Sequence, residues 1–196
     1  MLPSFQVRTS RLLLRPLEAA DRAEFIRCHA VNKDHFGPWW AAPPPGQTDE
    51  QLFEAQLARA TEGRERGTDV RLIGFTDDGR MGALVNLAQI FRGPFESAYI
   101  GWSVSVECAG RGIATEAVTA LMNLAFAPAP DGVGLHRVQA NIMPSNVRSL
   151  RVAEKCGFRR EGLAKDYLKI AGAWQDHFMF AKLADEHAEK RGVSGG

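Results

Sequence analysis

A segment near the middle of the chain, residues 98–125, restricts the possible folds more than any other. Its first part carries apolar residues at every second position, which predicts a β-strand; these residues are Ala98, Ile100, Trp102, Val104 and Val106. Its last part carries them at the spacing of a helix, at Ala114, Ala117, Val118, Leu121, Met122 and Ala125. Gly110 and Gly112 lie between the two patterns. The segment therefore predicts a strand, a glycine-rich loop and a helix in succession.

The loop between this strand and this helix has the properties of an anion-binding site. Gly110 and Gly112 have no side chains that would hold a ligand away from the backbone, so several N–H groups at the helix N-terminus can point at one anion. The helix dipole favours negative charge at the same place. A tight turn that binds nothing is the structural alternative.

Two common phosphate-binding loops do not match this segment. A P-loop requires a second glycine and a lysine at a fixed spacing, and neither stands at that spacing here. A dinucleotide-binding loop requires a third glycine at the position of Thr115, and the acidic residue that follows, Asp131, lies in a Pro/Gly loop. We therefore expect a different ligand that carries a pyrophosphate.

A second strand, loop and helix follow along the chain. Residues 135–142 alternate, with apolar residues on one face and polar residues such as Asn141 on the other. A helical stretch then opens at Asn146, which suits an N-cap, and ends at Gly157, which fits a left-handed C-cap. The chain therefore repeats the order of strand, loop and helix.

These two units resemble the GNAT superfamily of acetyl-CoA-dependent N-acetyltransferases. The acetyl-CoA loop of that family has the pattern Arg/Gln-x-x-Gly-x-Gly/Ala, and residues 109–114 match it except that Ala109 stands at the first position. The departure concerns a side-chain contact and not the backbone cradle. The next helix of the family commonly opens with Asn-x-x-Ser and ends in Gly-Phe, which residues 146–149 and 157–158 match.

The resemblance implies a mixed α/β fold, with a mostly antiparallel central sheet that is splayed between its fourth and fifth strands and flanked by helices. Acetyl-CoA would lie at the splay, with coenzyme A as the product. The backbone of residues 102–106 would pair with its pantetheine arm and stabilise the oxyanion of the reaction. The implied cofactor-binding residues are Trp102, Ser103, Val104, Val106, Ala109, Gly110, Arg111, Gly112, Ile113, Ala114, Thr115, Asn141, Asn146 and Ser149.

Within the superfamily the chain is most similar to the RimJ/RimL branch, whose members acetylate the N-termini of ribosomal proteins. The similarity covers residues 9–183. It includes the opening Thr9-Ser10-Arg11-Leu12-Leu13-Leu14-Arg15-Pro16-Leu17, the segment Phe36-Gly37-Pro38-Trp39, and two segments near the end, 164–168 and 172–177. These last segments are typical of the RimJ type, which implies the N-terminal alanine of a ribosomal protein as acceptor and a ribosomal protein or particle as partner.

The resemblance also implies how the reaction would be catalysed. Ser149 would protonate the departing thiolate of coenzyme A, and helix packing is its structural alternative. A water relay that ends at Asp166 would remove the proton of the attacking amine, with Asp176, His177 and Glu107 as lesser candidates. A weak base suffices for an N-terminal amine, because its pKa of about 8 lies well below the value of about 10.4 for lysine.

A long apolar loop near residue 40 is the expected acceptor site. Phe36, Trp39 and Trp40, followed by Pro43, Pro44 and Pro45, form an apolar stretch of a kind that often acts as a lid or a binding edge. The alternative is that Phe36 and Trp39 anchor the loop to the core. Together with Tyr167, which belongs to the RimJ-type segment, Phe36, Trp39 and Trp40 are the predicted substrate-binding residues.

A covalent cysteine mechanism and a metal site are not expected. Cys108 lies beside the glycine loop, but no histidine is placed next to it by the sequence. Cys28 and Cys156 fall in predicted helices, where a small buried residue is the ordinary interpretation. The five histidines show no metal-binding spacing, so we predict no metal.

Length and charge fit a small enzyme with one core. The chain has 196 residues, and we predict one domain over residues 1–183 and a flexible tail over residues 184–196. Lys and Arg number 24 against 23 Asp and Glu, so the overall charge gives no sign of nucleic-acid binding. The sequence shows no signal-peptide pattern and no apolar run of membrane-spanning length, and its three cysteines are unclustered. We therefore expect a cytoplasmic protein, without a prediction of its oligomeric state.

The remaining segments predict further elements of a mixed sheet. Strands are expected at 11–15, 70–75, 81–90, 163–170 and 174–183, with Asp77-Asp78-Gly79 as a hairpin turn. Helices are expected at 21–31 and from a capping box at Thr48 and Gln51 to about residue 66.

Three classes of function remain open on the sequence. The first is acetylation of a protein N-terminal alanine. The second is the same chemistry on a small amine such as an antibiotic or a polyamine, which an acidic pocket would favour. The third is a ribosome-associated assembly factor in which catalysis is secondary or lost.

Overall fold

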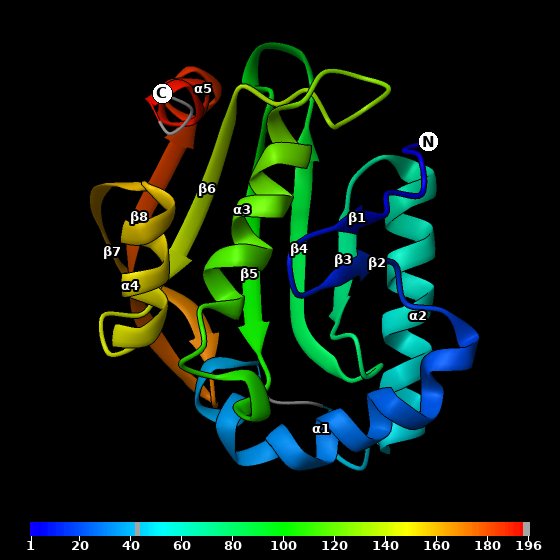
Figure 1. Cartoon of the computed structure of the whole chain (residues 1–196). Coiled ribbons are helices and arrows are strands. Elements are labelled where there is room, and N and C mark those ends of the chain that lie inside the picture. The colour runs from blue at the N-terminus through cyan, green and yellow to red at the C-terminus, as the bar shows by residue number, and fades with distance from the viewer. Residues whose placement is uncertain (42–43, 194–196) are drawn as a thin grey trace.

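The computed structural model describes residues 1–41 and 44–193, and its strands form one eight-stranded sheet (Figure 1). The order across the sheet is β1-β2-β3-β4-β5-β6-β8-β7. Neighbouring strands are antiparallel except β5 and β6, which are parallel. The strands are β1 (Val7–Arg8), β2 (Leu13–Arg15), β3 (Val70–Phe75), β4 (Met81–Phe91), β5 (Ser97–Val104), β6 (Arg137–Ile142), β7 (Arg159–Ile170) and β8 (Ala173–Leu183).

Helices flank this sheet. Figure 1 shows α3 and α4 on one face, α1 across the end at which β5 finishes, and α2 beside β3. Their bounds are α1 (Arg22–Phe36), α2 (Asp49–Arg66), α3 (Ile113–Phe126), α4 (Val147–Cys156) and α5 (Ala184–Val193). Short 3-10 turns also occur, among them η2 (Gly37–Trp39) and η4 (Val106–Cys108). The predicted mixed α/β class is confirmed.

The β5–β6 ladder is short, and this opens the sheet. Its residue pairs run from Ser97 opposite Arg137 to Tyr99 opposite Gln139, and no further pair follows in the described residues. β5 nevertheless continues to Val104 and β6 to Ile142. The strands therefore separate over their last residues, which confirms the predicted splay. The fourth and fifth predicted strands are β5 and β6 here, because β1 was not predicted. The separation leaves one edge of β5 without a strand partner.

Hydrogen bonds and backbone angles in the structure confirm several local predictions. Thr48 and Gln51 form both hydrogen bonds of the capping box, at 3.2 and 3.0 Å, at the start of α2. Gly79, in the turn between β3 and β4, has a φ of +78°, which a side chain would disfavour. The antiparallel pairing of β3 with β4 confirms the predicted hairpin.

The apolar core lies on both faces of the sheet. On one face, residues of α3 such as Val118 and Leu121 pack against the sheet together with Val85 and Val138. On the other face, a smaller cluster around Phe53 joins α1 and α2 to β3 and β4. The sheet is therefore held between two helical layers, and the open edge of β5 lies between them.

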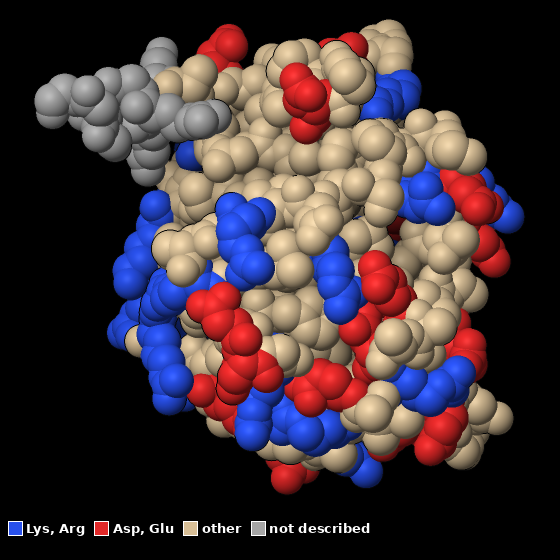
Figure 2. Space-filling view, turned by 45° about the vertical axis from the view of Figure 1, so that its right-hand side comes forward, with Lys and Arg blue, Asp and Glu red and all other residues tan. Residues whose placement is uncertain are grey.

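Charged side chains cover much of the surface in both signs. Figure 2 shows Lys and Arg gathered along one edge of the visible face and interspersed with Asp and Glu elsewhere. Ion pairs such as Arg22 with Glu54 and Arg80 with Glu107 join neighbouring elements on the surface. No helix in the described part of the chain is long and apolar enough to cross a membrane.

The C-terminal segment differs from its prediction. We expected a frayed tail from Ala184, but residues 184–193 form the helix α5. Glu186 in its first turn accepts a hydrogen bond from the Leu183 amide at 2.9 Å. His187 is buried, with its ring against Phe126 and its Nε2 2.7 Å from Asn123 Oδ1 of α3. Long-range packing therefore orders this polar sequence; residues 194–196 lie outside the described structure.

Other elements also depart from their predicted bounds. α1 runs to Phe36 rather than ending near residue 31, and η2 follows it directly, so most of the stretch predicted as an apolar loop is a 3-10 turn. β7 begins at Arg159 rather than at residue 163. The strand β1 was not predicted at all, because its two residues are too short for a periodic pattern. Ala42 and Pro43 of the Pro-rich loop lie outside the described residues.

Candidate active site

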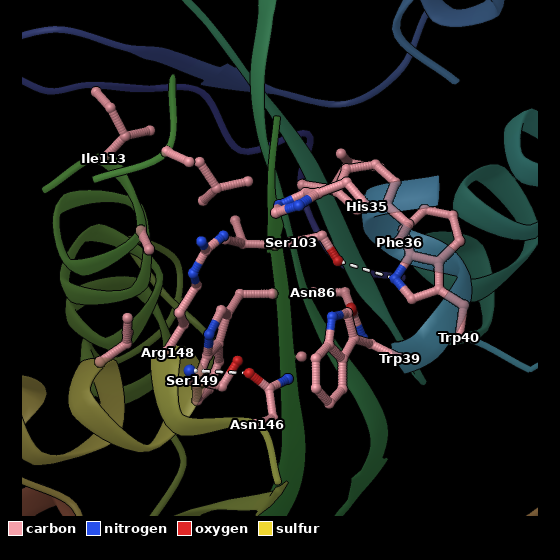
Figure 3. A pocket seen from close by; sticks show the side chains of 18 of the residues that line it. His35, Phe36, Trp39, Trp40, Asn86, Ser103, Ile113, Asn146, Arg148 and Ser149 are labelled. Carbon is pink, nitrogen blue, oxygen red and sulfur yellow. Dashed lines mark hydrogen bonds between the residues drawn. The ribbon is translucent and has the colours of Figure 1, made fainter. Parts of the chain in front are cut away.

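A cavity of about 1240 Å³ opens where β5 and β6 separate. It extends from the glycine loop and the start of α4 to the far side of β5, beneath α1 and α2. Figure 3 shows Asn146, Arg148 and Ser149 on one side and His35, Phe36, Trp39 and Trp40 on the other, with Asn86 and Ser103 between them. Two different molecules can therefore approach one point from opposite sides.

The glycine loop forms one end of this cavity in the predicted cradle geometry. Gly110 and Gly112 have φ values of +76° and +80°, which residues with side chains rarely adopt. Gly112 is the N-cap of α3, and no side chain caps this helix. The first hydrogen bond of the helix runs from the Glu116 amide to the Gly112 carbonyl, at 3.1 Å. The amides of Ile113, Ala114 and Thr115 come before it and have no carbonyl partner within the helix. These residues line the cavity, and their amides can receive an anion.

The start of α4 forms the adjacent wall. Asn146 Oδ1 accepts a hydrogen bond from the Ser149 amide at 3.1 Å, which confirms its structural role as the N-cap. Both side chains line the cavity, and the cap uses the backbone of Ser149 rather than its hydroxyl. Arg148, Arg151 and Lys155 also line it. This wall therefore offers a hydroxyl and three cations near the uncapped end of α3.

The opposite wall comes from the end of α1 and from η2. Phe36 is buried and stacks on Trp40, with the ring centroids 4.6 Å apart, and Trp40 Nε1 donates to Ser103 Oγ of β5 at 3.0 Å (Figure 3). Trp39 lines the cavity beside them. Phe36 is thus buried, as the anchoring alternative expected of it, whereas Trp39, the other expected anchor, lines the cavity with Trp40. The role of these residues in acceptor binding stays a prediction.

Asn141 and His177 line the cavity from β6 and from β8, the strand that pairs with β6 on the side away from the splay. Asn141 accepts a hydrogen bond from Gln139 at 3.2 Å and donates to the Tyr167 hydroxyl at 3.1 Å. His177 is buried, and its Nδ1 lies 3.0 Å from the carbonyl oxygen of Gln175. Because a carbonyl only accepts, Nδ1 carries the proton in the neutral ring, which leaves the lone pair on Nε2.

Most of the predicted cofactor residues line this cavity. They are Trp102, Ser103 and Val104 on β5, Ala109, Gly110, Gly112, Ile113, Ala114 and Thr115 at the glycine loop, and Asn141, Asn146 and Ser149 beyond it. The backbone, the uncapped helix and the basic wall together fit a ligand that has a pantetheine arm and phosphates.

Three predicted ligand residues are not among the lining residues. Val106 lies past the end of β5, in η4, and its amide donates to Asn32 Oδ1 at 2.7 Å, so that amide is already used. The Arg111 side chain is exposed outside the cavity, while its carbonyl accepts from Arg11 Nη1 at 2.6 Å. Tyr167 contacts two lining residues from outside the cavity, through its hydrogen bond to Asn141 and its ring against that of His177.

The predicted base Asp166 also lies outside the cavity. It is exposed on β7 with a φ of +45°, at an irregularity of the β7–β8 ladder that turns it away from the splay. Its amide donates to Asp176 Oδ1 at 3.0 Å, and Lys165 holds Asp176 at 2.7 Å, which lowers the pKa of Asp176. Of the four candidate bases, His177 lines the cavity.

The surroundings of Glu107 and Cys108 do not suit a catalytic role. Arg27 and Arg80 bind the Glu107 carboxylate at 2.8 and 2.9 Å, and the Arg27 hydrogen bond lowers its pKa. Cys108 does line the cavity, but burial raises the pKa of its thiol. A raised pKa keeps the thiol protonated at neutral pH and opposes a nucleophilic role.

Several polar lining residues on the side of α1 and α2 were not predicted from the sequence. Among them, His35 lies in the last turn of α1, Asn86 in β4 and Arg71 in β3. The signal for the last two was available, because each is a polar residue that interrupts an apolar strand. Periodicity alone assigns such a residue to a solvated face, and only the sheet order shows that this face is covered by helices.

The sequence match to known proteins agrees with this geometry. Residues 11–159 match the family model described as "Acetyltransferase (GNAT) domain". The chain belongs to the GNAT acetyltransferase family. It is 36% identical over 176 residues to the Bacillus subtilis protein named "Probable N-acetyltransferase YjcK", covering 88% of this chain and 93% of that one.

Two further GNAT proteins indicate the group within the family. The chain is 29% identical to the Escherichia coli [ribosomal protein uS5]-alanine N-acetyltransferase, over 92% of this chain and 91% of the relative. The structure of Mycobacterium smegmatis RimJ in complex with CoA-disulfide superposes with a TM-score of 0.86 at 28% identity, covering 100% of this chain and 98% of that chain. This GNAT chain is therefore an acetyl-CoA-dependent N-acetyltransferase of the RimJ/RimL group.

Proposed function

We propose that this enzyme acetylates the N-terminal amine of a protein, with the N-terminal alanine of a ribosomal protein as its acceptor. The observation that carries the proposal is the charge of the cavity. On the acceptor side its charged lining residues among the described ones are Arg71 and a single carboxylate, Asp34, with His35 and His177 besides, whereas Arg148, Arg151 and Lys155 lie on the coenzyme side. A polyamine carries several positive charges and would require a cluster of carboxylates on the acceptor side. The names of the E. coli relative and of RimJ support the same acceptor class.

The chemistry of an α-amine also suits this site. At neutral pH roughly a tenth of such amines are unprotonated, because their reference pKa is about 8. A lysine side chain, with a pKa of about 10.4, would need a stronger base or a strongly desolvating pocket. The buried imidazole of His177 is enough for an α-amine, and no carboxylate base is required.

The open edge of β5 and the glycine loop would hold acetyl-CoA, which supplies an activated acetyl thioester. The unpartnered backbone of residues 102–104 would bind the pantetheine arm as an added strand and donate an N–H to the thioester oxygen as negative charge develops there. The amides of Ile113, Ala114 and Thr115 would bind the pyrophosphate. The basic side chains of α4 would complete the phosphate site.

Two side chains would move the protons of the reaction. His177 Nε2 would take a proton from the attacking amine, directly or through one water, and the Nδ1 bond to Gln175 would fix the tautomer that permits this. The Ser149 hydroxyl would donate a proton to the leaving sulfur from the other side of the splay. This arrangement replaces the predicted base Asp166 with a residue inside the cavity.

The test is steady-state thiol release from acetyl-CoA with a panel of acceptors. The panel contains peptides that begin with Ala, Ser and Met, together with free lysine, spermidine and an aminoglycoside. We expect selective turnover of the Ala-starting peptide. Turnover confined to the small amines would overturn the proposal in favour of the second class. Acetyl-CoA binding without any turnover, combined with co-sedimentation with ribosomal particles, would favour an assembly factor.

A further inference from the structure

Arg71 is a cation in the part of the cavity that faces α2, away from the expected coenzyme site. It lies on β3, and its Nη2 donates to Asp69 Oδ1 at 2.8 Å. Its Nε is closed off from solvent and has no hydrogen-bond partner among the residues that the structure describes. A buried N–H without a partner is costly. The side chain as a whole is 22% exposed and lines the cavity, so the ion pair with Asp69 leaves the cation accessible.

Arg71 is aligned with the reaction centre by the register of the sheet. Arg71 pairs with Asn86 on β4, and Asn86 pairs with Gly101 on β5. A side chain at position 101 would collide with Asn86 Oδ1, at 2.9 Å, so the Asn86 amide lies over Gly101. Arg71, Asn86, Gly101 and, across the splay, Asn141 all line the cavity. Polar groups therefore run in one row from the open edge of β5 to Arg71.

The row of Arg71, Asn86 and Gly101 lies on the face of the sheet that Trp40 contacts. Ser103, two residues beyond Gly101 and hence on the same face of β5, accepts the hydrogen bond of Trp40. The acceptor would thus enter between η2 and the sheet, with its amine at the splay and the rest of its chain over β5, β4 and β3. A small amine would fill the first part of this path and leave Arg71 uncovered.

We propose that Arg71 is a specificity determinant that binds a carboxylate of the acceptor chain, a short distance beyond the reacting amine. This inference rests on the proposed function, because it assigns the acceptor a chain that crosses the sheet. The Arg71 side chain lines the cavity and is 22% exposed, so its guanidinium would donate to a carboxylate oxygen and supply the charge.

The spacing of the strands gives the position of that carboxylate in the acceptor. β3 and β5 are separated by two strand spacings of about 4.8 Å, which is about 10 Å in total. An extended peptide advances about 3.3 Å per residue, so about three residues cover this distance. An acceptor whose first residue lies beside β5 therefore brings its third or fourth residue over Arg71. The preferred acceptor has Asp or Glu at one of these positions.

The test is a scan of one glutamate through an otherwise neutral peptide. Octapeptides begin with Ala, carry Gln at positions 2–6, and have one Gln replaced by Glu in each member of the series. The measured quantity is kcat/KM at saturating acetyl-CoA and about 0.15 M salt. We expect a peak of about tenfold for Glu at position 3 or 4 over the all-Gln peptide. The wild-type enzyme alone can give this result, so it does not depend on a variant that folds.

Variants then assign the peak to Arg71. Arg71→Gln should abolish the peak, so that the Glu-containing peptides and the all-Gln peptide give the same kcat/KM in this variant, and Arg71→Lys should retain part of the peak. Arg66→Gln is the matched control, because Arg66 is an exposed arginine of α2. In Arg71→Gln alone, Asp69 would remain as a carboxylate without its ion-pair partner, which could destabilise the fold. The double variant Asp69→Asn/Arg71→Gln removes both charges and avoids this effect.

Each outcome separates this inference from the proposed function. A flat profile in the wild type, or a peak that survives in Arg71→Gln, would overturn the role of Arg71 while the acceptor class stands. Absence of turnover with every peptide, alongside turnover of spermidine, would overturn the proposed function and the inference together.

Discussion

Arg11 and Glu116, which are 105 residues apart in the chain, are joined by the Arg11 backbone amide and guanidinium at the base of the glycine loop. The amide donates to Glu116 Oε1 at 2.9 Å and Nε donates to Oε2 at 2.6 Å. Thr9 and Ser10 add hydroxyl donors to the same carboxylate, at 2.6 and 3.0 Å. Arg11 also donates to the carbonyl of Arg111 inside the loop. The β1–β2 connection therefore fixes the loop whose amides would bind the pyrophosphate.

Replacing Glu116 by Gln should weaken binding of acetyl-CoA without changing the chemical step. The variant loses a carboxylate with several charged or hydroxyl donors, so we expect a fall of about 1–2 kcal/mol in the free energy of unfolding and a KM for acetyl-CoA raised about fivefold. kcat should stay within about twofold. Steady-state kinetics and thermal unfolding measure both. Glu54→Gln, in an exposed pair with Arg22, is the control, and an unchanged KM in Glu116→Gln would contradict the account.

The same carboxylate gives a pH dependence with a defined sign. Burial alone would raise the pKa of Glu116, but hydrogen bonds from Thr9, Arg11 and Ser10 outweigh it, so the pKa lies below its usual value of 4.5. The stability that these bonds contribute is therefore fully present above about pH 4.5 and is lost as the pH falls through the lowered pKa. The difference in Tm between wild type and Glu116→Gln should be constant from pH 7 to 5 and shrink below pH 4.5. A difference that grows on acidification would contradict this sign.

Replacing Ser149 by Ala should lower turnover and leave the fold of α4 intact. Asn146 caps the helix through the Ser149 amide, which alanine retains, so a loss of activity would not come from the cap. We expect kcat to fall at least tenfold with a nearly unchanged KM for acetyl-CoA. Asn146→Ala is the contrasting variant, because it removes the cap and should lower the free energy of unfolding by about 1 kcal/mol. Equal kcat values for Ser149→Ala and wild type would assign Ser149 to packing alone.

Replacing His177 by Gln should remove the base. Glutamine can keep a hydrogen bond to the Gln175 carbonyl but cannot accept a proton, so we expect kcat to fall about a hundredfold. Asp166→Asn serves as the control and should retain kcat within about twofold, because Asp166 lies outside the cavity. The reverse result would restore Asp166 as the base.

The sequence alone predicted those parts of the site that depend on local backbone geometry. Gly110 and Gly112 occupy positive-φ positions, Asn146 caps its helix, and Thr48 with Gln51 closes a capping box. Each of these follows from steric limits or hydrogen bonds within four residues of the chain. For this reason the strands, the loop and the helices around the cofactor site were placed close to their observed bounds.

The parts that the sequence could not predict depend on distant partners. Val106 leaves the strand because Asn32, 74 residues away, takes its amide. Asp166 turns outward because of an irregularity in the β7–β8 ladder that no spacing reveals. Arg71 faces a covered cavity only because α2 packs over β3. In each case the residue type was visible in the sequence, but its surroundings were set by tertiary packing.

The most direct test of the proposed acceptor is the position of the acetyl group on a peptide that offers two amines. An Ala-starting peptide with one internal lysine is incubated with the enzyme and acetyl-CoA, and fragmentation mass spectrometry locates the added acetyl group. We expect acetylation of the α-amine with the lysine left free. Acetylation of the lysine side chain, or of neither amine under conditions in which spermidine is acetylated, would contradict it.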